Sequence, residues 1–439
     1  MARRREPETA EVVSLSHDGR GIAAPDGKKV FVTGGLPGEC VRIIRRKFHR
    51  RYDEAELLEV LAPSPARIAP RCAVFGTCGG CSLQHVSIAD QREMKQAALA
   101  DNLGRIGGVE PERWLAPVHA PGDGYGYRRR ARLAVKDVPG KGRVLVGFRE
   151  RHAPYVTDMH RCEVLAPPFD GLIDPLSELV GALGIRARLP QVEIAVAENA
   201  AELVFRVLDE PSAADRERLV RFGQDHGVRV SLQPGGPDSV VPLVPERPPE
   251  PLWYRLPEFE LRLEFAATDF VQVNASVNRL MVRQAVELLD VAPGQRVLDL
   301  FCGIGNFSLP LARRAGSVFG VEGASAQVAR AAANAAANGI GGAEFVTADL
   351  SAVDGREPWL KRQWDRVLLD PPRSGAAAVV ERQAALGPRR LVCVSCHPAT
   401  LARDAAILVG RGGYRLEAAG IVDMFPHTAH AEAMAVFVK

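Results

Sequence analysis

Apolar runs alternate with helix-like segments from about residue 269 to the C-terminus, and this alternation constrains the fold more than any other feature. The runs lie at 296–301, 317–322, 343–349, 365–372 and 390–396. Alternation of this kind builds right-handed strand–helix–strand units around a mostly parallel sheet. Ligands of such sheets bind beyond the carboxyl ends of the strands. The sequence therefore predicts an α/β domain over 269–439 with its site at one edge of the sheet.

Polar or reactive side chains stand at or just past the end of each of these runs. We expect them to line one crevice, because the carboxyl ends of parallel strands meet at the same edge. The residues are Asp299, Glu322, Asp349, Asp370 and Cys396.

The turn after the first run indicates a nucleoside ligand. Gly303 and Gly305 allow a tight turn and a close approach of the backbone, but Ser308 breaks the full dinucleotide pattern. Glu322 is spaced to bind ribose hydroxyls, and Asp349 to accept a hydrogen bond from an adenine amino group. Because no phosphate-binding lysine motif is present, we expect an adenosine ligand without phosphates, namely S-adenosylmethionine.

Cys396 is followed by a segment that starts like a helix, at 397–404. A helix N-terminus favours the thiolate, so Cys396 is a candidate nucleophile, although a buried structural cysteine is the alternative. Asp370 precedes Pro371 and Pro372, which stiffen the loop. Asp370 could hold either a substrate or the cofactor, and Arg373 could meet a phosphate. Glu432 is either a proton acceptor or an ordinary surface glutamate.

The chain length of 439 residues predicts about three domains. No apolar run is long enough for a membrane helix, and the basic N-terminus is not followed by the apolar stretch of a secretion signal. We therefore expect a cytoplasmic protein that contacts no membrane.

Residues 11–60 contain five short alternating runs separated by turn signals, which predicts a small β-barrel over 1–65. The fourth run overlaps a basic stretch, 41–51, whose arginines we expect on one face. A second basic stretch is at 127–132. These stretches indicate either a nucleic-acid docking surface or simply a solvated face.

Between the barrel and the α/β domain we expect a mainly β central domain, 66–268. A helix is predicted at 87–106, where it could pack on the C-terminal domain, and a proline-rich loop at 233–254.

Cys72, Cys78 and Cys81 lie close together in this central part, and Cys162 is the candidate for a fourth ligand. Eight cysteines in a cytoplasmic chain of this length indicate metal binding or catalysis rather than disulfides. Four thiolates suit zinc or an iron–sulfur cluster, and their spacing does not separate the two. The neighbouring His85 and His160 are interpreted as surface or supporting groups.

Three separate segments, 299–308 (DLFCGIGNFS), 368–375 (LLDPPRSG) and 394–404 (VSCHPATLARD), resemble the signature segments of the bacterial RNA uracil-C5-methyltransferases. The stretches 269–274 and 424–432 are also similar, so the resemblance covers most of the chain. It implies a Rossmann-like methyltransferase domain, a TRAM domain as the barrel, and a 4Fe–4S cluster on Cys72, Cys78, Cys81 and Cys162. By the same resemblance, the cofactor is surrounded by Gln272, Phe301, Asn306, Glu322, Asp349 and Asp370. His397 departs from the family, which more often has Asn after the nucleophile, and this changes the expected hydrogen bonds there.

The implied chemistry requires a thiol and a base. Carbon 5 of uracil is a poor nucleophile until a thiolate, here Cys396, adds to carbon 6. A base, here Glu432, then removes the carbon-5 proton so that the cysteine can leave. The target base must also leave its stack, and Phe270 is either its stacking partner or a core aromatic.

The resemblance implies methylation of the domain IV uridine of 23S rRNA. We expect the chain to act as a monomer, with phosphate contacts from the basic barrel and Arg128–Arg132. Another 23S rRNA uridine or the tRNA T-loop uridine remains an alternative substrate. An amino-group methyltransferase would need no thiol. An iron–sulfur redox enzyme and a non-catalytic RNA-binding protein are the alternatives from other classes.

Overall fold

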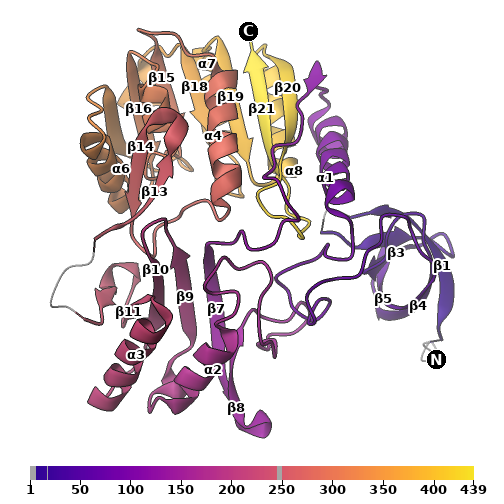
Figure 1. Cartoon of the computed structure of the whole chain (residues 1–439). Helices are drawn as coiled ribbons and strands as arrows, with labels where there is room; N and C mark the ends of the chain where they lie inside the picture. Colours follow the sequence, from indigo (N-terminus) through magenta and orange to yellow (C-terminus); the bar gives the residue numbers. More distant parts are fainter. Residues whose placement is uncertain (1–5, 17, 245–249) are drawn as a thin grey trace. The chain divides into compact units, whose positions relative to one another are not determined.

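The computed structural model describes residues 6–16, 18–244 and 250–439 (Figure 1). Contacts within the chain form two compact units. The first unit consists of Met1–Ala98, Phe148–Asp158 and Phe425–His430, and the second of Leu99–Gly147, Met159–Met424 and Ala431–Lys439. None of the helices in the described residues is both long and apolar enough to cross a membrane. The predicted boundaries 1–65, 66–268 and 269–439 stay a prediction.

The first unit contains the predicted closed barrel, which Figure 1 shows as a ring of strands near the N-terminus. Its core consists of buried aliphatic side chains, among them Val12, Val32 and Ile43. The strands follow each other around the barrel in the order β1-β2-β3-β5-β4. Their bounds are β1 (Glu8–Leu15), β2 (Gly21–Ala23), β3 (Lys29–Thr33), β4 (Cys40–Phe48) and β5 (Tyr52–Ala62).

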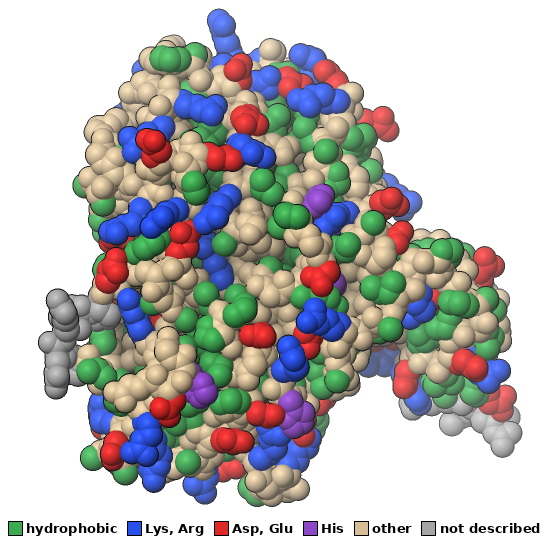
Figure 2. Space-filling model, viewed as in Figure 1, with side chains coloured by type: hydrophobic (Ala, Val, Ile, Leu, Met, Phe, Trp, Pro, Cys, Tyr) green, Lys and Arg blue, Asp and Glu red, His purple; other side chains and the backbone are tan. Residues whose placement is uncertain are grey.

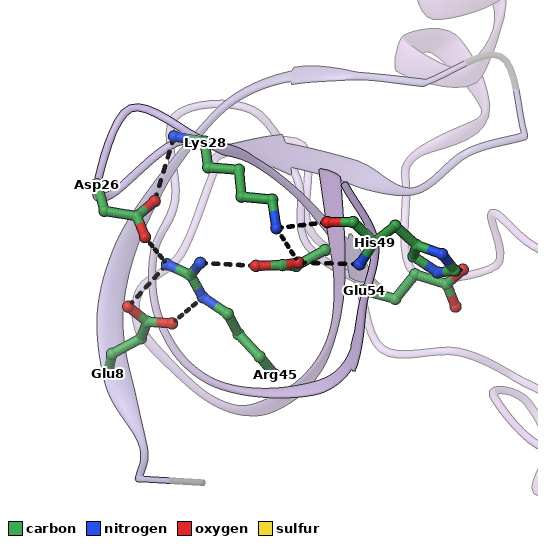
Figure 3. A network of polar contacts seen from close by, with 7 residues as sticks. Glu8, Asp26, Lys28, Arg45, His49 and Glu54 are labelled. Carbon is green, nitrogen blue, oxygen red and sulfur yellow. Dashed lines mark hydrogen bonds and ion pairs between the residues drawn. The ribbon is translucent and has the colours of Figure 1, made fainter. Parts of the chain in front are cut away.

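The basic strand β4 does not place all its arginines on one face. Val41 and Ile43 point into the core and Arg42 is exposed, as alternation requires, but the pairing with β5 is irregular at three places. The side chain of Arg45 is only 11% exposed, and it forms ion pairs with the buried Asp53 and two further acids (Figure 3). The one-face prediction is therefore wrong for Arg45.

The first unit also includes the cysteine-bearing loop and the start of the predicted helix, α1 (Ile88–Asn102). The Gln91 side chain fixes the loop by donating hydrogen bonds to the carbonyl oxygens of Leu83 and Val86. It also accepts a hydrogen bond of 2.7 Å from the backbone N–H of His427. Residues far apart in the sequence thereby meet inside this unit.

The central region contains a six-stranded sheet, in the second unit. Two helices that the sequence analysis did not predict, α2 and α3, lie between its strands in the sequence. The helix α3 carries a capping box of Ser212 and Asp215 and ends at the left-handed Gly227. The elements are β7 (Arg130–Val138), β8 (Arg143–Gly147), α2 (Ile173–Ala182), β9 (Gln191–Val196), β10 (Ala201–Arg206), α3 (Ala213–His226), β11 (Arg229–Gln233) and β12 (Val241–Pro242), with strand order β12-β11-β10-β9-β7-β8. The proline-rich loop predicted at 233–254 includes 245–249, which lie outside the described residues.

A hairpin of β13 (Leu252–Leu256) and β14 (Leu261–Phe265) precedes the large sheet. Two asparagine side chains bind the backbone of β14 as a neighbouring strand would. One belongs to α6 (Ser325–Ala337), and the other is the C-cap residue of this helix. Asn334 accepts from the N–H of Glu264 and donates to its carbonyl, and Asn338 does the same for Arg262. Asn334 also donates to the carbonyl of Ile304, so the hairpin is tied to the glycine turn.

The predicted α/β domain is present as an eight-stranded sheet, which also includes a short strand from residues 113–114; the later strands are drawn in orange to yellow in Figure 1. Neighbouring strands from β17 to β19 are parallel, and β21 runs antiparallel to both β19 and β20. The sheet order is β17 (Ala343–Thr347), β16 (Ser317–Glu322), β15 (Arg296–Leu300), β18 (Arg366–Leu369), β19 (Arg390–Ser395), β21 (Glu432–Val438), β20 (Arg415–Val422) and β6 (Arg113–Trp114).

Helices pack against this sheet and share one large core with it. Leu99 and Leu103, at the end of the predicted helix 87–106, are buried in the same cluster as Leu298 and Leu369 of the sheet. The remaining α-helices are α4 (Ala275–Leu289), α5 (Ser308–Ala312), α7 (Ala377–Leu386) and α8 (Pro398–Gly410). Short helical turns occur at η1 (Leu103–Gly107), η2 (Pro139–Lys141), η3 (Arg186–Arg188), η4 (Pro237–Ser239), η5 (Pro257–Phe259) and η6 (Pro358–Lys361).

Candidate active site

The predicted strand-end residues occupy the carboxyl ends of adjacent parallel strands. Asp299 is the last but one residue of β15 and Glu322 the last residue of β16, while Asp370 and Cys396 directly follow β18 and β19. Asp349 comes two residues after the outermost strand, β17, where it is exposed. Its Oδ1 accepts hydrogen bonds from the backbone N–H and the hydroxyl of Ser351, so it is already engaged locally.

The glycine turn between β15 and α5 has a backbone that few side chains would tolerate. Gly305 has a φ of 93°, and a Cβ there would lie 2.0 Å from the Cδ1 of Leu309. Phe301, which is not a glycine, also has a positive φ, 65°. Non-glycine residues in this region are strained and tend to occur at binding sites. The N–H of Gly303 donates to Glu322 at 3.1 Å, which joins the turn to the end of β16.

Buried carboxyl groups converge under this turn. The pKa of Asp299 is raised to about 7, chiefly by burial and in smaller part by the neighbouring Asp370 and Glu322, while a hydrogen bond from Ser308 opposes the shift. Burial and Glu322 also raise the pKa of Asp370 to about 7. The Oδ1 atom of Asp299 is buried and has no partner among the described residues. A site of this kind favours a ligand that is cationic and donates hydrogen bonds.

The side chain of Asn306 is hydrogen-bonded to Tyr254 and Asn278, which limits the hydrogen bonds it can make to a ligand. Its Oδ1 accepts from the Tyr254 hydroxyl at 2.9 Å and from the Asn278 amide at 3.0 Å, and its own amide donates to Asn278 at 2.9 Å. With its oxygen already accepting two bonds, Asn306 has one amide hydrogen left for a ligand. It is therefore available as a donor.

Gln272 lies in the loop before α4 and is almost fully buried. Its carbonyl accepts a hydrogen bond of 2.8 Å from the Nε of Arg129, whose guanidinium lies 4.6 Å from the centre of the Tyr254 ring. Burial lowers the pKa of Arg129 to about 10. Neither Arg129 nor the largely buried Arg130 faces solvent, so the predicted phosphate surface Arg128–Arg132 does not include these two side chains. In this loop, Phe270 is 65% exposed and is not a core aromatic.

Cys396, Glu432 and Asp370 form a second acidic group. The pKa of the Cys396 thiol is raised to about 11, chiefly by burial and in smaller part by the carboxylates of Glu432 and Asp370, while Arg373 opposes the shift. The helix α8 begins two residues later, and the predicted stabilisation of the thiolate by its N-terminus stays a prediction.

His397 is the N-cap residue of α8, but its side chain makes no capping bond to the helix. Its backbone N–H meets the Ser395 hydroxyl at 3.3 Å, and its carbonyl accepts from the Thr400 hydroxyl at 2.9 Å. Pro398 starts the helix instead, a position where no N–H is needed. These bonds hold the backbone beside the thiol without using the imidazole as a cap.

Sequence reasoning missed how the proline loop is attached to α8. Asp404 accepts a hydrogen bond of 2.9 Å from the N–H of Ala376, and Arg403 donates to the carbonyl of Ser374 at 3.2 Å. Both residues belong to the segment 394–404 that also contains the thiol. Both residues were visible in the sequence, but their role in holding the proline loop is evident only from the tertiary contacts.

The four candidate ligand cysteines do not all belong to the same compact unit. Cys72, Cys78 and Cys81 belong to the first unit and Cys162 to the second. Burial raises the pKa of Cys78, and the nearby Cys72 adds to the rise. The N–H of Gly80 points to the Cys78 sulfur at 3.4 Å, and the Arg151 guanidinium donates to the carbonyl of Cys81. Among the described residues, no group of three His, Cys, Asp or Glu side chains is already arranged to hold a metal ion.

Comparison with known proteins decides the family. The family described as tRNA (Uracil-5-)-methyltransferase matches residues 255–439. A 23S rRNA (uracil(1939)-C(5))-methyltransferase of Alkalilimnicola ehrlichii is 54% identical over 99% of this chain and 97% of its own length. The chain belongs to the RNA uracil-C5-methyltransferases. Another RNA uracil-C5-methyltransferase named for the same uracil, from Methylococcus capsulatus, is 50% identical over 99% of this chain and 97% of its own.

A solved member of the family shares the fold. The tRNA (uracil-54, C5)-methyltransferase of Pyrococcus abyssi, in complex with S-adenosyl-L-homocysteine, is 25% identical. It matches with a TM-score of 0.72 over 98% of this chain and 100% of its own. The recognition of an RNA uracil-C5-methyltransferase from the three signature segments is thereby confirmed.

The acidic surroundings of Cys396 predict opposite effects of two neighbouring substitutions. Glu432→Gln removes a like charge, so the thiol pKa should fall and alkylation by iodoacetamide at pH 8.5 should become several-fold faster. Arg373→Gln removes the opposing charge and should slow alkylation. Mass spectrometry of the Cys396 peptide measures both rates, and a shift of both variants in the same direction would contradict this account of the pKa.

Proposed function

We propose that this chain transfers a methyl group from S-adenosylmethionine to carbon 5 of a uridine in 23S rRNA. The observation that carries the proposal is the placement of the Cys396 thiol beside the carboxylates of Glu432 and Asp370, at the sheet edge that also holds the glycine turn. The relatives that are half identical over nearly the whole chain support the ribosomal substrate and the uridine numbered 1939 in their names.

The thiol does the first part of the work. Cys396 adds to carbon 6 of the uracil, and the electron pair of the 5,6 double bond moves toward carbon 5 and the neighbouring carbonyl. Because the thiol pKa is about 11, little thiolate exists at neutral pH, so the thiol gives up its proton to solvent as the sulfur attacks. Glu432 and Asp370 are carboxylates close enough to raise the pKa of this thiol.

The base completes the reaction. S-adenosylmethionine supplies an electrophilic methyl group on a cationic sulfur. Once carbon 5 bears both the methyl group and its original hydrogen, Glu432 takes that hydrogen as a proton. The electron pair of the broken bond restores the double bond and expels the Cys396 thiolate. Proton transfer from Glu432 to the Cys396 thiolate restores both groups, so one proton is released to solvent per turnover, and the product is 5-methyluridine.

The site residues fit the cofactor by charge and by hydrogen-bonding capacity. The partnerless oxygen of Asp299 and the raised pKa values of Asp299 and Asp370 indicate carboxyl groups that a cationic ligand would stabilise in the ionised form. We assign the cofactor contacts, as the sequence predicted, to Gln272, Phe301, Asn306, Glu322, Asp349 and Asp370.

We also propose that Cys72, Cys78, Cys81 and Cys162 bind a 4Fe–4S cluster. The guanidinium of Arg151 supports this, since it lies in the field of Cys78 and Cys81 and would offset the negative charge of bound thiolates. Structural zinc is the alternative for four thiolates. Metal analysis of protein purified without oxygen should give iron and inorganic sulfide, and zinc alone would refute the cluster.

Methylation of a tRNA uridine is the second candidate, because the structural neighbour from Pyrococcus abyssi is named as a tRNA enzyme. The ribosomal reading is favoured because the relatives of higher identity are named as 23S rRNA enzymes. A ribosomal substrate would place the protein in the cytoplasm. It would act there as a monomer on a uridine flipped out of its stack.

Two active-site variants should fail at different steps. Cys396→Ala should form no covalent complex with RNA, because no thiolate can add to carbon 6. Glu432→Gln should add and methylate but release product slowly, so a complex stable to denaturing gels should accumulate. Gel analysis with labelled 23S rRNA tests both, and an adduct formed by Cys396→Ala would exclude this mechanism.

Cofactor affinity should rise with pH through about 7. Asp299 and Asp370 are partly protonated near pH 7 in the ligand-free protein, and a cationic ligand favours their ionised forms, so binding should release protons. Calorimetry in buffers of different ionisation enthalpy measures this release. S-adenosylhomocysteine, which lacks the sulfonium charge, is the control and should show a weaker pH dependence. Equal pH dependence for both ligands would argue against the carboxyl groups.

A further inference from the structure

The basic stretch of the barrel, 41–51, divides into paired and unpaired cations. Along β4 the cations are neutralised by acids of neighbouring strands and turns. Arg42 pairs with Glu59, Arg46 with Glu56 and Lys47 with Glu54.

Arg45, on the same strand, is neutralised by three acids rather than one. Its guanidinium contacts Glu8, Asp26 and the buried Asp53, and Asp53 also binds Lys28 (Figure 3). The hydrogen bond from Arg45 and the charge of Lys28 act against burial and hold the pKa of Asp53 below its usual value. The face shown in Figure 2 likewise has Lys and Arg interspersed with Asp and Glu. Most of the basic stretch is therefore occupied with holding the barrel together.

The tip of the β4–β5 hairpin is different. Arg50 and Arg51 are exposed, and the described residues offer their side chains no ion pair or hydrogen bond. Lys29 is also exposed and without such a partner in the described chain, and in the strand pairing it lies opposite Tyr52, at the start of β5. Three cations without acidic partners thus surround one end of the barrel.

Aromatic rings lie among these cations. The His49 ring stacks on Tyr52 with centroids 4.4 Å apart and an interplanar angle of 28°, and Tyr52 meets Phe31 edge-on at 5.3 Å. The guanidinium of Arg20 covers Phe31 at 4.5 Å from the ring centre. Glu54, drawn beside His49 in Figure 3, pairs with Lys47 and lies 3.3 Å from the Nε2 atom of His49. We call Lys29, Phe31, His49, Arg50, Arg51 and Tyr52 the tip patch.

We propose that the tip patch binds an unpaired stretch of the RNA substrate, with phosphates on Lys29, Arg50 and Arg51 and one base stacked on the exposed face of His49. This rests on the proposed function, in that RNA is the substrate. Phosphates favour cations whose charge is not already used, and unpaired bases stack on aromatic rings. A double-stranded RNA has no base free to stack, so the patch fits a loop or a single strand.

The structure offers a matched pair of variants for the test. Arg50→Gln/Arg51→Gln removes two unpaired cations, and Arg42→Gln/Arg46→Gln removes two paired ones with the same change in net charge. Binding of the full-length protein to a 23S rRNA fragment is measured at several salt concentrations. The tip variant should lower the slope of log K against log salt by about 1.4, at about 0.7 for each lost phosphate contact, while the control stays near the wild type.

The size of the affinity change follows from the same relation. At about 0.1 M salt, two lost contacts should weaken binding on the order of 25-fold. Equal losses in the tip and control variants would mean that only the overall charge matters, and would overturn the proposal. No loss in the tip variant would also overturn it.

Stacking is tested separately. His49→Ala should weaken binding roughly tenfold without changing the salt slope, because a stacking contact is lost but no phosphate contact. RNA containing 4-thiouridine should crosslink to a peptide within 48–52, and crosslinks confined to other segments would contradict the assignment. Unchanged thermal unfolding confirms that each variant is folded.

These readouts separate this proposal from the proposed function. A tip variant at saturating RNA should still form the covalent complex through Cys396, because the catalytic residues are unchanged. If the wild type binds RNA through the tip patch but forms no covalent complex, the proposed reaction fails and the docking surface stands.

Discussion

The parallel pairing of β15 with β16 and β18 is the constraint on which the active site depends. It brings the carboxyl groups of Asp299, Glu322 and Asp370 to one edge of the sheet, where burial makes the negative charges of Asp299 and Asp370 costly. The charge of Glu322 raises the pKa of both aspartates. The sheet geometry thereby prepares a place for positive charge before any ligand arrives.

The same constraint shapes the surroundings of the candidate nucleophile. Cys396 directly follows β19, the strand next to β18, so it lies in the same acidic environment. A thiol that is hard to ionise is protected from unwanted alkylation or oxidation, since the thiolate is the reactive form. The proposed function then requires that a substrate base, brought within reach, change the balance of charges around the sulfur.

The sequence predicted the sheet well because strand ends and helix starts have local signals. The acids and the thiol could be placed from their position after apolar runs, and the barrel from its turn residues. The helices α2 and α3 were missed, although Ser212 and Gly227 mark the ends of α3. The burial of Arg129, the raised pKa of Cys396 and the pairing of the β4 arginines were beyond prediction, because each depends on residues distant in the chain.

The attachment of Ala376 and Ser374 to α8 through Asp404 and Arg403 has a mechanical consequence. The proline loop and the start of α8 carry Asp370 and Cys396, and they are fastened to each other as well as to the sheet. The proline loop and the start of α8 would therefore move together. The separation of the Asp370 carboxyl group and the Cys396 thiol is therefore set by these bonds as well as by the pairing of β18 with β19.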